Sequence, residues 1–179
     1  NVKVLDMNRG KLLLAERECG HRVKTVLSGA EAIGEALREA DLVVSAVHVM
    51  GEHAPRMISR EALRTMRPGA VVVDIAIDQG GTFETSRPTT HASPYYVEEG
   101  IVHYCVTNMP AAVPRTSTLA LTASTLPYLV SFARSGVIGA LRADEGLLSG
   151  LNTWEGNVTC PGVAKAFGKP YVPPGQALG

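Results

Sequence analysis

The sequence predicts an α/β fold with a mostly parallel sheet and helices on both of its faces. Apolar, β-branched runs alternate along the chain with helix-forming segments, and parallel strands need such crossover connections. Two of the runs, 41–47 and 70–76, are continuous rather than alternating, which is typical of strands buried on both faces. Ligands of such sheets bind beyond the carboxyl ends of the strands, so the residues that follow each strand are the first candidates for a site.

Five strands with helices between them are expected in the first part of the chain. The first helix should end at Gly20, because glycine readily takes the conformation that closes a helix. The second follows the capping-box sequence Ser28-Gly29-Ala30-Glu31, and the third follows Ser59, whose hydroxyl can cap it. The strands are expected at 2–6, 22–27, 41–47, 70–76 and 101–106, and the helices at 11–18, 31–37 and 59–63.

The pattern changes after the fifth strand. Thr116 or Ser117 can cap a long helix with an apolar face, and Pro127 should kink or break that helix because it lacks a backbone donor. A second helix is expected at 137–148, and the Gly- and Pro-rich tail should be irregular apart from 163–167. The change places a domain boundary near 110–116 and divides the chain into domains 1–113 and 114–179.

Composition and charge exclude several classes of protein. The chain of 179 residues is 45% hydrophobic and 19% charged, which suits an ordinary packed core. Its 17 basic residues balance 17 acidic ones, which argues against a nucleic-acid binder, since such proteins carry a basic excess. No run of 18 apolar residues occurs that could span a membrane.

The cysteines and histidines predict no metal site and favour a reducing compartment. Cys19, Cys105 and Cys160 lie far apart and form no C-x-x-C pair, and the histidines lack the spacing of zinc ligands. A cytoplasmic location is therefore expected. The chain also begins with Asn1 and runs at once into a strand, which suggests a segment of a longer protein, with a trimmed natural terminus as the alternative.

Four short motifs that follow or end strands are candidates for a site, each with a plain structural alternative. Asp6 ends the first strand, where an acid can accept both ribose hydroxyls of a dinucleotide, but it can equally be a strand-end or cap residue. Asp78-Gln79-Gly80-Gly81 lets a ligand approach the backbone or is a simple turn. The segment 86–90 can bind a carboxylate or is a solvated loop, and 108–110 can hold an amide ring or is a linker.

One combination of sequences is more specific than any of these motifs. It comprises AVVVDIAIDQGG at 70–81, FETSRPTT at 83–90, HYCVTNMP at 103–110 and VPRTST at 113–118. In this combination the chain resembles the alanine dehydrogenase family, over essentially all of its residues and in the second half of that family's chain. The related transhydrogenase cofactor domain shares the fold, but the unbroken Asp-Gln-Gly-Gly and Ser-Arg-Pro-Thr-Thr favour alanine dehydrogenase.

The resemblance implies an NAD-dependent enzyme that converts L-alanine, NAD⁺ and water into pyruvate, ammonium and NADH. It implies two Rossmann-like domains with the active site in the cleft, and a homohexamer as the usual assembly. For this chain it implies a partial Rossmann-like parallel sheet that lacks its first strand and glycine loop. Helices that return to a second, catalytic domain would follow this sheet.

The resemblance also implies roles for individual residues. Asp78 would be the catalytic residue of this half and would lie by the nicotinamide ribose and the reaction centre. Asp6 would bind the ribose as its acid. The other cofactor-binding residues would be Lys11 and Ser28 near the adenosine end, Val47 along the cofactor, Ile75 by the nicotinamide ribose, and Val106, Asn108 and Met109 beside the nicotinamide. No metal ligand is implied.

The chain also departs from the family's pattern. The family's substrate-binding Arg and Lys, its catalytic His and its glycine loop all belong to the N-terminal half, and no G-x-G-x-x-G occurs here. His48 and Met50 stand where the family more often has an aliphatic residue and a proline. We therefore expect the segment alone to be inactive, to aggregate or to bind NAD weakly, and to require the missing half. The alternative is a remnant or split subunit that acts as an interaction or assembly module, and the reading frame upstream of Asn1 distinguishes the two.

Overall fold

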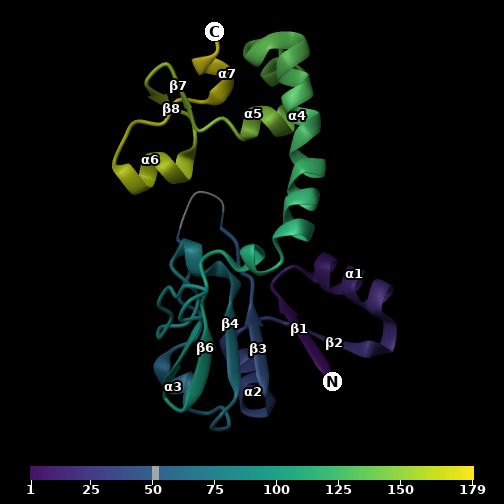
Figure 1. Ribbon diagram of the computed structural model, residues 1–179, viewed down its shortest axis with the longest axis vertical. Coiled ribbons are helices and arrows are strands. Elements are labelled where there is room, and N and C mark those ends of the chain that lie inside the picture. The colour runs from purple at the N-terminus through teal and green to yellow at the C-terminus, as the bar shows by residue number, and fades with distance from the viewer. Residues whose placement is uncertain (50–52) are drawn as a thin grey trace. The chain divides into compact units, whose positions relative to one another are not determined.

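The structure is a computed structural model that describes residues 1–49 and 53–179 (Figure 1). Met50, one of the two departures noted above, lies outside the described residues. The chain divides into two compact units, the first made of Asn1–His48 and Ala54–Thr107, and the second mainly of Asn108–Gly179. The domain bounds 1–113 and 114–179 stay a prediction.

The first unit holds a four-stranded sheet and a separate strand pair. In the sheet, β3 (Leu42–Ser45), β4 (Val71–Asp74) and β6 (Ile101–Tyr104) are parallel neighbours, and β5 (Tyr95–Glu98) is antiparallel to β6 at the edge. The separate pair is formed by β1 (Val2–Asp6) and β2 (Val23–Leu27), which are also parallel. The predicted α/β fold on parallel strands is therefore confirmed.

Helices connect the parallel strands of this unit. α1 (Arg9–Cys19) and the 3₁₀ turn η1 (Gly20–Arg22) link β1 to β2, α2 (Ala30–Glu39) links β2 to β3, and α3 (Arg60–Leu63) lies between β3 and β4 in the chain. Ser59 caps α3 as predicted, because its Oγ accepts a hydrogen bond from Ala62 N at 3.1 Å. Ser28 does not cap α2: the residue at the cap position is Gly29, which has no side chain to offer.

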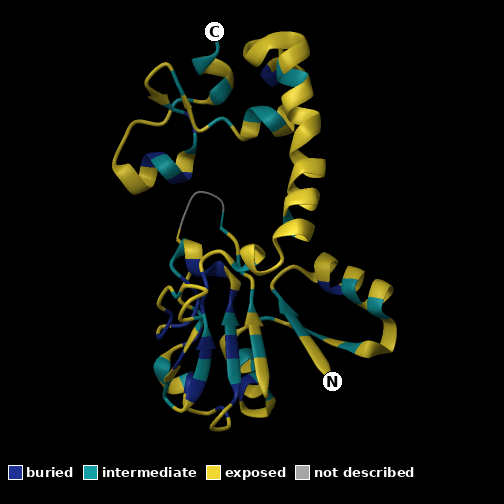
Figure 2. Cartoon of the chain, in the orientation of Figure 1, coloured by how far each residue is buried: buried dark blue, intermediate teal, exposed yellow. Residues whose placement is uncertain are grey.

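One face of the four-stranded sheet carries the core. The core joins α2, α3, the sheet and the loop after β4 through Leu37, Leu63, Val72, Phe83 and Ile101, all almost fully buried. Figure 2 shows the buried residues concentrated in this sheet and in the segments against it. Each such side chain contributes about 1.5–3 kcal/mol when it is removed from water, so this cluster is the main source of the unit's stability.

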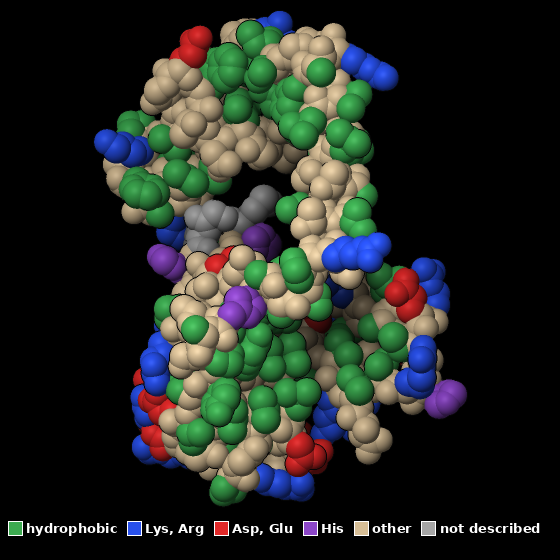
Figure 3. Space-filling view, in the orientation of Figure 1, with side chains coloured by type: hydrophobic (Ala, Val, Ile, Leu, Met, Phe, Trp, Pro, Cys, Tyr) green, Lys and Arg blue, Asp and Glu red, His purple; other side chains and the backbone are tan. Residues whose placement is uncertain are grey.

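The opposite face of the same sheet is apolar and open. Side chains alternate along a strand, and the register places on this face Leu42, Val44, Val71, Val73, Val102, Tyr104, Tyr95 and Val97. Leu42 is 58% and Val44 55% exposed, and Figure 3 shows apolar side chains gathered over β3, β4 and β6. The prediction of a strand buried on both faces at 41–47 is therefore wrong for Leu42 and Val44, and helices on both faces of the sheet stay a prediction.

The second unit is mainly helical. It begins with the 3₁₀ turn η3 (Met109–Ala112) and the long helix α4 (Pro114–Ala143), which α5 (Glu145–Ser149) follows. The tail was predicted to be irregular apart from 163–167. It forms β7 (Thr153–Trp154), β8 (Asn157–Val158), α6 (Pro161–Phe167) and α7 (Pro174–Ala177). No helix among the described residues is long and apolar enough to cross a membrane.

The start of α4 differs from the prediction, and its break matches one of the two predicted positions. Pro114 rather than Thr116 or Ser117 begins the helix, because proline suits the first helical position, where its missing N–H loses no partner. The backbone leaves the helical conformation at Gly136, with φ 70° and ψ 170°, directly before the second helix that was predicted from 137, and does not break at Pro127. A positive φ suits glycine, which lacks a Cβ, so the glycine sets the break.

Two hairpins that the sequence analysis did not predict share one kind of turn. Glu99 and Gly100 join β5 to β6 with φ of 54° and 75°, and Glu155 and Gly156 join β7 to β8 with φ of 45° and 83°. A two-residue hairpin turn of type I′ needs positive φ at both positions. The Glu-Gly pair was therefore the available signal, in a position where Asn-Gly is more usual.

The turn residue Glu99 predicts a stabilisation that acid removes. Its carboxylate accepts hydrogen bonds from Arg64 Nε at 2.7 Å and Arg60 Nη1 at 2.6 Å, and these lower the pKa of Glu99 from 4.5 to about 2. A carboxyl whose pKa is lowered by folding stabilises the protein above its unfolded pKa, and the contribution is lost as the pH falls toward the folded pKa. In urea unfolding, Glu99→Gln should have a lower midpoint than the unsubstituted protein at about pH 6, and the two midpoints should converge toward about pH 2.

Glu155→Gln is the matched control for this prediction. Glu155 has the same positive φ in a Glu-Gly turn but forms no ion pair within the described part of the chain. Its midpoint should follow that of the unsubstituted protein through the whole pH range. An equal loss for Glu99→Gln at every pH would show that the ion pairs do not stabilise the fold.

Candidate functional site

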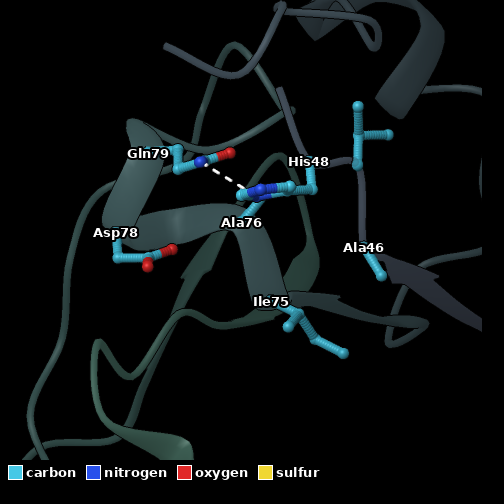
Figure 4. Close-up of a pocket in the computed structure, with 7 residues that line it drawn as sticks. Ala46, His48, Ile75, Ala76, Asp78 and Gln79 are labelled. Carbon is cyan, nitrogen blue, oxygen red and sulfur yellow. Dashed lines mark hydrogen bonds between the residues drawn. The ribbon is translucent and has the colours of Figure 1, made fainter. Parts of the chain in front are cut away.

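A pocket lies where β3 and β4 end at the same edge of the sheet. The strands are parallel and Ser45 pairs with Asp74, so the segments that follow them leave the sheet side by side. Between these segments is a hollow of about 210 Å³, which we call the strand-end pocket (Figure 4). Its lining residues are Ala46, Val47, His48, Ile75, Ala76, Asp78 and Gln79. The structure thus brings together three residues proposed from the sequence, Val47, Ile75 and Asp78.

The wall of the pocket after β4 is a tight turn. Residues Ile75–Gln79 form the 3₁₀ helix η2. Inside the turn, Gly80 N donates to Ile77 O and Gly81 N donates to Ala76 O, both at 3.0 Å. The predicted strand at 70–76 therefore ends earlier, at Asp74, and the residues after it bend back to form the pocket wall.

Asp78 lies on this wall with its side chain exposed. No hydrogen bond or ion pair joins it to another residue in the described segments. The turn is capped by Asp74 instead, whose Oδ1 accepts from Ala76 N at 3.2 Å. The plain alternative for Asp78, a turn-capping role, is therefore taken by a different residue, and the carboxylate of Asp78 is available to a ligand.

His48 and Gln79 form a second polar feature of the pocket. Figure 4 shows their side chains pointing toward each other across it, and Gln79 Nε2 lies 3.0 Å from His48 Nδ1. This hydrogen bond joins the segment after β3 to the turn after β4. No role was expected for Gln79 from the sequence, although it follows Asp78 directly.

A buried polar network holds the turn on its buried side. Asp74 is 0% exposed, and its Oδ2 accepts hydrogen bonds from Thr82 N at 2.7 Å and Ser86 Oγ at 2.5 Å. Ser86 is itself buried. The interpretation of 86–90 as a solvated loop is therefore wrong at this residue. The carboxylate that Ser86 binds is the chain's own Asp74.

Gly81 is required by this network. A Cβ on Gly81 would lie 2.6 Å from Ser86 Cβ and 2.7 Å from Asp74 Oδ2, and its φ is +82°. Any side chain would collide with the buried carboxylate and would also be strained by the positive φ. The glycine of the Asp-Gln-Gly-Gly motif is therefore explained by packing inside the chain, without a ligand.

Aromatic residues hold the loop after Gly81 in place. The ring of Tyr96 stacks on His103 with centroids 4.8 Å apart. His103 Nδ1 donates to Ile101 O at 2.9 Å, so its Nε2 accepts from Thr85 Oγ1 at 2.8 Å. Burial lowers the pKa of His103 and raises the pKa of Tyr96. Both rings are therefore neutral near pH 7. The guanidinium of Arg87 lies over Tyr96, 3.9 Å from the ring centroid.

The proposed ribose acid lies at the carboxyl edge of the β1–β2 pair. Asp6 Oδ1 accepts from Asn8 N at 2.7 Å, and no described residue donates to its Oδ2. Ser28 is close by, since its N–H donates to Asp6 O at 3.0 Å. Lys11 is exposed in the first turn of α1, next to the cap residue Asn8. The structure thus brings Asp6 and Ser28 together and places Lys11 at the start of the helix that follows Asp6.

The three residues proposed to flank the nicotinamide follow β6 but do not line the strand-end pocket. Val106 is buried and bridges to Thr89. Asn108 and Met109 belong to the second unit, where Asn108 is exposed and precedes η3. Among the described residues, no group of three or more His, Cys, Asp or Glu side chains could hold a metal ion.

Comparisons with known proteins identify relatives along the whole chain. Residues 1–161 match the family described as "Alanine dehydrogenase/PNT, C-terminal domain". The alanine dehydrogenase of Halomonas elongata is 51% identical over 178 residues, which cover 99% of this chain and 48% of that protein. The alanine dehydrogenase of Bacillus subtilis is 45% identical over 179 residues, which cover 99% of this chain and 47% of that protein. The chain therefore spans about half the length of the curated relatives it matches.

Solved structures show the same likeness. An L-alanine dehydrogenase superposes with a TM-score of 0.79 at 43% identity, over 94% of this chain and 46% of the other. A transhydrogenase from Sinorhizobium meliloti superposes with a TM-score of 0.66 at 22% identity, over 89% of this chain and 42% of the other. The second likeness concerns the fold alone.

Proposed function

The chain belongs to the alanine dehydrogenase/PNT C-terminal domain family, and we propose that it is the C-terminal half of an NAD-dependent alanine dehydrogenase. The complete enzyme would convert L-alanine, NAD⁺ and water into pyruvate, ammonium and NADH. The observation that carries the proposal is the strand-end pocket at the carboxyl edge of parallel strands, which Val47, Ile75 and Asp78 line and in which the Asp78 carboxylate has no hydrogen-bond or ion-pair partner among the described residues. Ligands of open α/β sheets bind at that edge.

The residues of the pocket and of the β1–β2 edge support a proposal of dinucleotide binding. Ala46 and Ala76 have small side chains, which leave the pocket open to a flat ring. Asp6 retains a carboxylate oxygen without a partner in the described segments, as binding of ribose hydroxyls requires. Val47 and Ile75 would then contact the cofactor along its length, with Lys11 and Ser28 near its adenosine end and Val106, Asn108 and Met109 near its nicotinamide.

Asp78 would act on the substrate in this arrangement. Bound NAD⁺ supplies the acceptor for the hydride that leaves the alanine Cα. The substrate then becomes a cationic iminium, and water adds to it before ammonium leaves. A carboxylate beside these atoms stabilises the cation and can hold the water through a hydrogen bond. The groups that hold the substrate carboxylate and exchange the protons would come from the N-terminal half.

The proposal is tested by an assay of the complete protein that contains this chain. NADH formation should depend on L-alanine and NAD⁺, and the reverse reaction on pyruvate, ammonium and NADH together. Parallel assays with other small amino acids define the substrate. Absence of NADH formation with every amino acid, from protein that binds NADH, would favour the remnant or assembly module instead. The hexamer and the cytoplasmic location stay predictions, which gel filtration and cell fractionation can check.

Asp6 should select NAD over NADP in this enzyme. Its carboxylate would repel the 2′-phosphate of NADP at close range. Asp6→Ala should therefore reduce the ratio of kcat/KM for NAD to that for NADP by roughly tenfold or more, about 1.4 kcal/mol. Asp41→Ala is the matched control, because Asp41 is an exposed acid of the same unit that pairs with Arg67, and it should not change the ratio. A ratio that Asp6→Ala leaves unchanged would remove Asp6 from the cofactor site.

A further inference from the structure

The position of Asp78 depends entirely on the backbone that carries it. Its side chain makes no hydrogen bond or ion pair within the described segments, so no contact of its own fixes the carboxylate. The turn from Ile75 to Gly81 must supply that order. Its internal hydrogen bonds, from Gly80 N to Ile77 O and from Gly81 N to Ala76 O, shape the turn but do not tie it to the sheet.

A single buried carboxylate ties both ends of this turn to β4. Asp74, the last residue of β4, accepts from Ala76 N through Oδ1 and from Thr82 N through Oδ2. Ala76 lies near the beginning of the turn and Thr82 directly after its end. The third donor, Ser86 Oγ at 2.5 Å, holds Oδ2 from the loop beyond. Because both oxygens accept and all three donors are buried or backbone groups, the carboxylate has one orientation.

The packing around Asp74 leaves no room for a different arrangement. Asp74 and Thr82 are 0% exposed, and the Cα of Gly81 passes so close that a Cβ there would lie 2.7 Å from Asp74 Oδ2. Charge-assisted hydrogen bonds of this kind are stronger than neutral ones. The carboxylate of Asp74 therefore holds both ends of the turn from the buried side, Ala54 N holds its middle by donating to Gln79 O at 2.8 Å, and Asp78 extends from its exposed side.

We propose that Asp74 is a positioning residue for the reaction: its buried carboxylate fixes the turn 75–81 and thereby holds Asp78 in the strand-end pocket. This inference rests on the proposed function. A displacement of Asp78 by even about 1 Å would reduce catalysis strongly, because electrostatic stabilisation of the transition state requires preorganised groups.

Two substitutions disturb this carboxylate to different degrees. Asp74→Asn replaces one acceptor oxygen with an amide nitrogen, which can only donate. This nitrogen must then face Ala76 N, or the pair Thr82 N and Ser86 Oγ, all of which are donors themselves. Ser86→Ala removes one donor and leaves both backbone hydrogen bonds in place, so it keeps the test valid if Asp74→Asn does not fold. Val72→Ala is the matched control, since Val72 is a fully buried residue of the same strand that belongs to the apolar core and does not contact the turn through a hydrogen bond.

Hydrogen exchange gives the first readout, independent of activity. In the complete protein, Ser86→Ala and Asp74→Asn should speed amide exchange in the segment 75–82, as followed by mass spectrometry. Val72→Ala should leave exchange in this segment unchanged relative to the rest of the sheet. Unchanged exchange at 75–82 in both Asp74→Asn and Ser86→Ala would overturn the inference, whatever the enzyme's activity.

Kinetics give the second readout. We expect kcat to fall roughly tenfold in Ser86→Ala and roughly 10²-fold in Asp74→Asn, with KM for alanine changed less than about threefold. The double variant Asp74→Asn/Asp78→Asn should be no slower than Asp78→Asn alone, because residues that act as a unit are not additive. Multiplied losses in the double variant, or an equal loss of kcat in Val72→Ala, would overturn the inference. Failure of the proposed function would appear separately, as an unsubstituted protein without alanine-dependent NADH formation.

Discussion

Asp78→Asn in the complete enzyme should lower kcat by roughly 10²-fold or more, a size typical of a positioned electrostatic or acid–base group. Asparagine has the shape of aspartate but no charge, so it cannot stabilise the cationic iminium. Folding and NADH affinity should be nearly unchanged, because Asp78 makes no hydrogen bond or ion pair within the described segments. Steady-state kinetics and NADH fluorescence titration measure the two effects.

Asp144→Asn separates this result from a loss of helix or turn capping. Asp144 caps α5 through a hydrogen bond from Leu147 N at 2.9 Å, a role that asparagine can also fill. Its kcat should therefore match that of the unsubstituted enzyme. A rate for Asp78→Asn close to the unsubstituted rate would show that the carboxylate takes no part in the reaction.

Gly81→Ala should destabilise the protein by roughly 3–5 kcal/mol, which is large for a single methyl group. The new Cβ would lie within 2.7 Å of Ser86 Cβ and Asp74 Oδ2, both buried. It would also force an alanine to a φ of +82°. Asp74 cannot move away, because its two oxygens hold three donors. Urea unfolding followed by circular dichroism measures the change.

Gly69→Ala isolates the backbone part of this effect. Gly69 has nearly the same φ, +85°, but a Cβ there would meet no atom within 4 Å. Its loss should therefore be only the strain of a left-handed alanine, about 1–2 kcal/mol. Equal losses for the two variants would mean that the contact with Asp74 and Ser86 costs nothing, and the account of the buried network would be wrong.

The parallel strands and the edge that carries the pocket could be predicted from the sequence. Continuous β-branched runs mark β3 and β4, and the rule that ligands bind at the carboxyl ends of such strands leads directly to Val47 and Asp78. The motif Asp-Gln-Gly-Gly was also visible. The reason for the second glycine of the motif could not be predicted. Gly81 is required because it packs against Asp74 and Ser86, and Ser86 is five residues further along the chain.

The remaining differences come from contacts that local patterns do not encode. The exposure of Leu42 and Val44 depends on what packs on the sheet, which a strand's own composition cannot report. The long helix continues through Pro127, where a kink or break was expected, whereas the φ of +70° at Gly136 directly precedes the second helix that was expected from 137. The buried carboxylate of Asp74 was indistinguishable in sequence from an ordinary strand-end acid.

A chimera shows whether this chain can serve as the C-terminal half of an alanine dehydrogenase. This chain would replace the corresponding C-terminal half of the Halomonas elongata alanine dehydrogenase, to which it is 51% identical, so that the N-terminal half of the relative supplies the groups that this chain lacks. The chimera should form NADH from L-alanine and NAD⁺ at a rate within roughly tenfold of the relative, and Asp78→Asn should lower that rate by roughly 10²-fold. A folded chimera that binds NADH but does not oxidise alanine, beside an active relative, would contradict the account.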